Sequence, residues 1–156
     1  MNTFSSSRLA EAVVDGPIES VWELLVDPSV LARHTPFIST IRDLGDDKWC
    51  WSLSGITYPG GHFGATFIEE MTFMPTTRID FRPDPDAGNQ RAGATGTYTL
   101  TEDGPRTHLR IELTVSIQLP APKAARRLIE PAMHSVIAYM GDSFAKGFVR
   151  ELSSRT

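Results

Sequence analysis

The sequence predicts an α+β fold in which a curved, seven-stranded antiparallel sheet wraps around a long C-terminal helix, with two short helices between strands 1 and 2. Three observations support this fold class. Residues 18–27 carry apolar side chains at helical spacing, residues 37–114 alternate apolar and polar side chains between turns, and the chain beyond residue 122 returns to helical spacing. The turns are short, which favours antiparallel neighbours because parallel strands need long crossovers.

The N-terminal elements follow from local signals. Residues 1–7 are polar and rich in serine without the apolar block of a signal peptide, so we expect a polar tail ahead of one domain spanning 8–153. A first strand is predicted over 8–15, ended by Gly16-Pro17. A helix then runs from Ile18 to Asp27-Pro28, where proline disfavours helical geometry in the preceding residue. A second short helix is expected through 30–32.

Five turn signals divide the central region into strands, at residues 45–47, 58–61, 74–76, 83–91 and 102–105. The clearest strand is the last one, where Leu109 to Leu119 alternate strictly between apolar and polar side chains. The same alternation turns Trp49, Trp51 and Tyr98 toward the core. Aromatic residues on such a face are often plain core, and a buried tyrosine often bonds only to backbone, so both interpretations stay open.

The C-terminal segment predicts a helix that lies across the concave face of the sheet. Its apolar stripe has three- and four-residue spacing and consists of Ile129, Met133, Val136, Ile137, Met140, Phe144 and Phe148. Pro131 lies within this segment, so a short helix, a kink or break at the proline, and then a long helix are expected.

Three stretches carry a family resemblance. Residues 17–28 contain a Val21-Trp22 pair and a closing Asp27-Pro28, residues 74–79 form a proline turn followed by Arg78-Ile79, and Gly96-Thr97-Tyr98 opens a strand. Together with the order of elements, they resemble the helix-grip fold of the START/Bet v 1-like (SRPBCC) superfamily and its polyketide cyclase-like branch. The resemblance spans about residues 8–152 and implies a hydrophobic molecule held between sheet and helix.

The aromatase/cyclase branch of that superfamily uses arginines inside the cavity. Here Arg78, Arg82 and Arg110 all fall on the predicted outer face of the sheet. This departure favours a binding role over catalysis.

Composition excludes several partners. The net charge of −4 offers no basic excess for nucleic acid. The single Cys50 excludes an internal disulfide and fits a cytoplasmic location, and no apolar run approaches the length of a transmembrane segment. The four histidines show no ligand spacing, so neither a metal nor another cofactor is expected. A homodimer is left open.

Glu69 is the most informative residue, because alternation places its carboxylate among apolar side chains, at Phe63, Ala65, Phe67, Met71 and Phe73. An acid on that face needs a partner or a raised pKa. It could anchor a ligand hydroxyl or act as a general acid or base. The alternative is a β-bulge that shifts the register and turns Glu69 to solvent.

The leading hypothesis is a protein that binds a hydrophobic or amphipathic small molecule, lipid-like or polyketide-like. The expected ligand-binding residues are Trp49, Trp51, Phe67, Glu69, Met71, Tyr98, Met133, Ile137, Met140 and Phe144. A second hypothesis is a cyclase/aromatase-like lyase without metal or nucleotide cofactor, in which Glu69 and Tyr98 form the acid/base pair. A third is an accessory subunit that docks on another protein, for which a filled core and an exposed apolar patch would be the sign.

Overall fold

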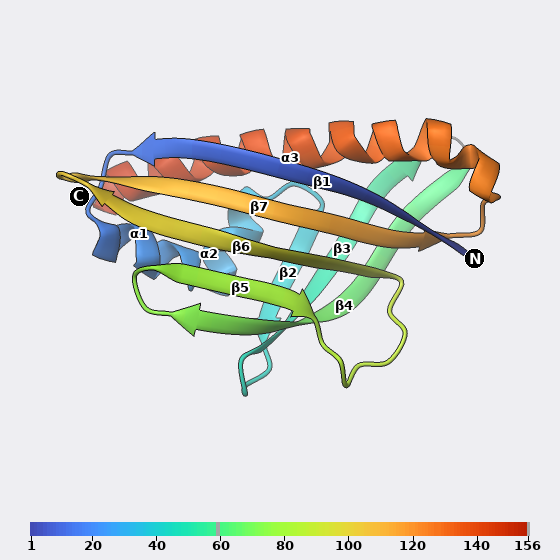
Figure 1. Ribbon diagram of the computed structural model, residues 1–156, viewed down its shortest axis with the longest axis horizontal. Helices are drawn as coiled ribbons and strands as arrows, with labels where there is room; N and C mark the ends of the chain where they lie inside the picture. Colours follow the sequence, from blue (N-terminus) through green and yellow to red (C-terminus); the bar gives the residue numbers. More distant parts are fainter. Residues whose placement is uncertain (59, 156) are drawn as a thin grey trace.

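The computed structural model describes residues 1–58 and 60–155, and it confirms the predicted fold class (Figure 1). Its elements are β1 (Asn2–Val14), α1 (Ile18–Leu25), α2 (Pro28–His34), β2 (Ile38–Asp43), β3 (Lys48–Tyr58), β4 (Gly61–Met74), β5 (Arg78–Pro83), β6 (Ala92–Asp103), β7 (Arg106–Leu119), the 3₁₀ turn η1 (Lys123–Ala125) and α3 (Arg126–Arg155). The seven strands form one antiparallel sheet in the order β1-β7-β6-β5-β4-β3-β2. The long helix α3 runs alongside β1.

The expected polar tail at residues 1–7 is wrong, because β1 begins at Asn2 and pairs with β7 along its whole length. The serines that suggested a tail are strand residues, and two of them have polar cross-strand partners. Ser5 and Ser7 exchange hydroxyl hydrogen bonds with Ser116 (2.8 Å) and Thr114 (2.7 Å). Phe4 on the opposite face is fully buried. A serine-rich strand of this kind has the composition of a tail, so composition alone misplaced the boundary.

The two short helices form where they were predicted, although α2 runs from Pro28 to His34 and is longer than the expected 30–32. Pro17 precedes α1, and Asp27 caps α2 by accepting a hydrogen bond from the Ser29 amide at 3.0 Å. The carboxylate of Glu151 ties α2 to the end of α3 by pairing with His34 and Arg33, each at 2.6 Å. These bonds fix α2 against one end of the long helix.

The sequence predicted a kink or break at Pro131, and the break is wrong, since α3 continues through the proline. No separate short helix precedes Pro131 in the described residues, because η1 ends at Ala125 and residues 126–130 already belong to α3. Pro131 removes only the amide that would bond to the carbonyl of Arg127, one turn earlier. Arg127 is exposed, so water can satisfy that carbonyl and the helix tolerates the proline.

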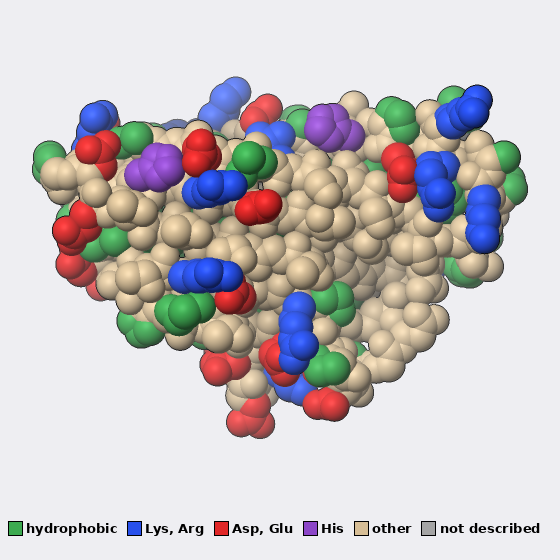
Figure 2. Space-filling model, in the orientation of Figure 1, with side chains coloured by type: hydrophobic (Ala, Val, Ile, Leu, Met, Phe, Trp, Pro, Cys, Tyr) green, Lys and Arg blue, Asp and Glu red, His purple; other side chains and the backbone are tan. Residues whose placement is uncertain are grey.

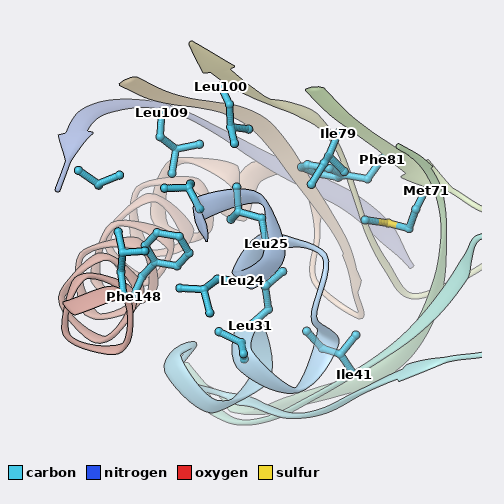
Figure 3. Close-up of a cluster of buried hydrophobic side chains, with 14 of the residues drawn as sticks. Leu24, Leu25, Leu31, Ile41, Met71, Ile79, Phe81, Leu100, Leu109 and Phe148 are labelled. Atoms are coloured by element: carbon cyan, nitrogen blue, oxygen red, sulfur yellow. The ribbon is translucent and has the colours of Figure 1, made fainter. Parts of the chain in front are cut away.

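The core consists of two separate hydrophobic clusters at opposite ends of the sheet. One cluster packs Leu24, Leu25 and Leu31 of the short helices against Phe148 of α3 and against inward side chains of the strands (Figure 3). The other gathers around Phe4, Phe63, Phe67, Ala92, Leu119 and Met133. The space between the two clusters is therefore bounded by apolar side chains from both.

The outer face of the sheet is polar. Charged side chains of both signs are scattered over the face seen in Figure 2, and hydrophobic ones stand apart from one another. Arg78, Arg82 and Arg110 lie there as predicted, paired with Asp80, Glu70 and Glu112. Within residues 1–58 and 60–155, no helix is long and apolar enough to cross a bilayer.

Candidate functional site

A cavity of about 910 Å³ lies between the inner face of the sheet and α3. This volume falls within the range of roughly 300–1,000 Å³ that small-molecule sites occupy. Its wall takes side chains from both hydrophobic clusters and is predominantly apolar. The residues expected to line it do so with one exception, and they are Trp51, Phe67, Glu69, Met71, Tyr98, Met133, Ile137, Met140 and Phe144.

Trp49 is the exception. It faces inward as alternation predicted and is 2% exposed, but it does not border the cavity. Its ring packs against Phe73, with centroids 5.6 Å apart, and against Trp51 at 6.4 Å. Trp49 is therefore core behind the cavity wall, while Trp51, stacked on Phe67 with nearly parallel rings, belongs to the wall itself.

Glu69 faces inward, and the alternative of a bulge that turns it to solvent is wrong. The β3–β4 register runs unbroken from Lys48↔Glu70 to Leu53↔Ala65. The bulge in this pair comes later, between Leu53 and Ile56, where Gly55 adopts a φ of 81° that disfavours other residues. Glu69 is 1% exposed and lines the cavity.

A gap in the sheet explains how the protein accommodates this acid. The β5–β6 ladder ends at Phe81↔Gly96, and beyond it the chain leaves β6 and follows β4, with the Asp84 amide donating to the carbonyl of Ile68 at 2.9 Å. The amide of Ala94 on β6 therefore lies past the end of that ladder. It donates instead to Oε1 of Glu69 at 2.6 Å. The carboxyl group of Glu69 thus accepts the hydrogen bond that a continued β5 strand would otherwise accept from Ala94.

Only one of the two carboxyl oxygens is used in this way. Oε2 of Glu69 is buried and has no hydrogen-bond partner in the described part of the chain. Burial raises the pKa of Glu69 from 4.5 to about 8, against the smaller lowering effect of the Ala94 amide. At neutral pH the group is mainly a neutral acid, and its proton is expected on Oε2 because Oε1 accepts from an amide.

Two further polar groups share this wall. Nε1 of Trp51 is also buried without a partner among the described residues, and it lies on a side chain that borders the cavity. Tyr98 packs edge-on against Phe81, with ring centroids 5.2 Å apart, and it lines the cavity too. Burial raises the pKa of Tyr98 to about 12, with a smaller contribution from the charge of Glu69. The wall therefore offers a few polar groups within an apolar surface.

Arg8 is a lining residue that the sequence prediction missed. It shares the inner face of β1 with Phe4 and Val14, and it borders the cavity. Its Nη2 donates to Oδ1 of Asp142 on α3 at 2.9 Å. The alternation of Phe4, Arg8 and Val14 carries the signal. It was lost because residues 1–7 were assigned to a tail, which left the phase of β1 undetermined.

The sequence and the fold have known relatives. The profile of a family described as polyketide cyclase / dehydrase and lipid transport matches residues 6–149. No curated protein matches the chain in sequence. The fold is similar to that of a conserved protein from Geobacillus kaustophilus, with 21% identity, a TM-score of 0.72 and coverage of 95% of each chain.

Two more solved structures share the fold across nearly their whole length. A START superfamily protein from Mycobacterium smegmatis has 15% identity and a TM-score of 0.70, covering 96% of this chain and 99% of the other. The Zhui aromatase/cyclase from Streptomyces sp. R1128 has 16% identity and a TM-score of 0.71, covering 97% and 95%. At such identities the likeness concerns the fold alone.

Proposed function

This chain belongs to the polyketide cyclase / dehydrase and lipid transport family, and on that premise we propose that it binds a hydrophobic or amphipathic small molecule between its sheet and α3. The observation that carries the proposal is a large apolar cavity whose lining includes Glu69 and Trp51, two side chains that each have a buried polar atom, Oε2 and Nε1, without a partner in the described residues. Buried polar groups are normally satisfied, so both atoms are suited to contact a ligand.

Affinity would come mainly from apolar burial, at about 25 cal/mol per Å² of surface removed from water. The polar atoms would orient the ligand. Nε1 of Trp51 is a donor, and the neutral form of Glu69 donates from Oε2, so a carbonyl or hydroxyl oxygen on the ligand would satisfy either group.

The binding test uses the neutral fluorescent probe N-phenylnaphthylamine and a variant that fills the cavity. Leu113 of β7 lines the cavity, so Leu113→Trp should weaken probe binding by about tenfold or more. Glu112→Trp, on the exposed face of the same strand, is the matched control and should bind as the wild type does. A wild-type protein that takes up no probe, or equal affinity in both variants, would contradict the proposal.

A second candidate is a cyclase or dehydratase reaction, with Glu69 as general acid and base and Tyr98 as its partner. A specific observation favours it, because a pKa near 8 lets Glu69 exchange its proton close to neutral pH inside an apolar wall. The test uses a poly-β-ketone thioester, and mass spectrometry detects the loss of water from it. Glu69→Gln should abolish this loss while it still binds N-phenylnaphthylamine. Unchanged turnover in this variant rules out the mechanism.

The accessory-subunit hypothesis has less support. Its expected sign was a filled core, whereas a cavity of about 910 Å³ separates the two hydrophobic clusters.

A further inference from the structure

Arg8 places a positive charge at the edge of a mainly apolar cavity. It lies on the inner face of β1 where this edge strand meets α3, in a seam bordered by small residues at Ala10, Ala12 and Gly141. A Cβ built on Gly141 would lie 3.0 Å from Nε of Arg8, so the guanidinium packs against the helix backbone itself. The arginine is thus positioned between cavity and surface, with its side chain 22% exposed.

The existing partner of Arg8 leaves most of its hydrogen-bonding capacity unused. Among the described residues the guanidinium donates one hydrogen bond, to Asp142, out of five available N–H groups. The side chain of Asp142 is 69% exposed, and an ion pair with a partner so well solvated contributes little. Asp142 therefore neutralises Arg8 through a single, solvent-exposed contact. An anion that is more buried and accepts more hydrogen bonds could replace it at the guanidinium.

The other charge at this seam does not compete for Arg8. Glu11 also borders the cavity mouth, but it belongs to the outward-facing set of β1, and its carboxylate lies 3.9 Å from Nε2 of His108 on β7. The neighbouring side chains of β7 along the inner wall are aliphatic, at Ile111, Leu113 and Val115. An anionic group in the cavity would therefore find its cation in Arg8.

We propose that Arg8 binds an anionic group, such as a carboxylate, of an amphipathic ligand whose apolar part fills the cavity, with the ligand anion taking the place of Asp142. This inference rests on the proposed binding function and adds the chemical class of the ligand. Bidentate pairing with the planar guanidinium would make the contact directional.

The sheet register indicates how long such a ligand is. Arg8 lies opposite Leu113, which lies opposite Gly96, and Ala94, the partner of Glu69, is two residues from Gly96. Two strand spacings and a two-residue step separate the Cα atoms of Arg8 and Ala94 by about 12 Å. A molecule with an acid at one end and an oxygen about that far along it could contact both polar regions.

The test compares two ligands with the same apolar chain. Dodecanoate and dodecanol are used to displace N-phenylnaphthylamine from wild type, Arg8→Gln and Arg8→Lys. We expect dodecanoate to bind the wild type more tightly than dodecanol does. Arg8→Gln should weaken the affinity for dodecanoate by about tenfold and change the affinity for dodecanol by no more than about twofold. Arg8→Lys, which keeps the charge, should retain part of the preference. Circular dichroism checks that each variant is folded.

Two further variants complete the design. Asp142→Asn frees the guanidinium and should bind dodecanoate at least as tightly as the wild type, while Arg110→Gln, on the outer face, should change neither ligand. Equal loss of both ligands in Arg8→Gln, or an unchanged preference for dodecanoate, would overturn the role of Arg8. Failure of the wild type to bind N-phenylnaphthylamine at all would instead refute the proposed binding function.

Discussion

The buried acid at position 69 makes a quantitative prediction about stability. The pKa of Glu69 is about 8 in the folded chain, against 4.5 when the group is free in water. Between these two values the native state holds one proton more than the unfolded state, so unfolding releases a proton and the free energy of unfolding falls as pH rises. The slope is about 1.4 kcal/mol per pH unit, which over this interval amounts to at most about 5 kcal/mol.

Glu69→Gln removes the titration but keeps the geometry. The amide oxygen of glutamine can accept the hydrogen bond from Ala94, and its NH₂ group stands where the protonated Oε2 was. We expect wild type and variant to be about equally stable near pH 4.5. The variant should gain on the wild type with every unit above that, until the difference levels off near pH 8.

Urea unfolding followed by tryptophan fluorescence, from about pH 5 to about pH 8, measures this difference. Glu70→Gln is the matched control, because the adjacent carboxylate points to the outer face and pairs with Arg82. It should keep the decline of the wild type. If the free energies of unfolding of wild type and Glu69→Gln change in parallel with pH, the raised pKa is refuted. If they converge as pH rises, the direction of the pKa shift is refuted.

Three other substitutions test the packing of α3. Gly147→Ala would bring a methyl group against the imidazole of His34, and we expect urea unfolding to show a loss of about 1–3 kcal/mol. Hydrogen bonds from His34 and from the arginines that contact Glu151 hold the pKa of its carboxyl group at about 2. The wild type should therefore lose this stabilisation as pH falls from 4.5 toward 2. Acid unfolding of Glu151→Gln should show no such loss. Pro131→Ala restores a helical amide at an exposed position. It should raise the free energy of unfolding by about 1–3 kcal/mol, which thermal unfolding would show as a higher melting temperature.

Local signals predicted most of the fold. Pro17 and Asp27-Pro28 mark the first helix because proline and capping act within one turn of chain. Alternation predicted the inward orientation of Glu69 because the side chains of a regular strand change face at every residue. The start of β1 was missed, since its serines find their partners on β7, more than a hundred residues away.

The sequence predicted which side chains face inward, but not which of them border the cavity. Alternation turned both Trp49 and Trp51 inward, yet only Trp51 reaches the cavity, because Phe73 covers Trp49. That difference depends on three-dimensional packing, which periodicity does not carry. The ladder gap at Ala94 was hidden as well, since the turn predicted at 83–91 marks the end of β5 but does not show that the departing chain follows β4 and leaves the Ala94 amide to Glu69.

The gap at Ala94 also bears on why position 69 carries an acid. A glutamine would satisfy the same amide without an ionisable proton, and by the linkage above it would make the protein more stable at neutral pH. The sheet alone therefore gives no reason for a carboxyl group. What the acid adds is an oxygen that can hold a proton or release it inside the cavity. A ligand that only needs an anchor would bind Glu69→Gln as well as the wild type, whereas chemistry on the ligand would stop, so this one variant separates a carrier from a catalyst.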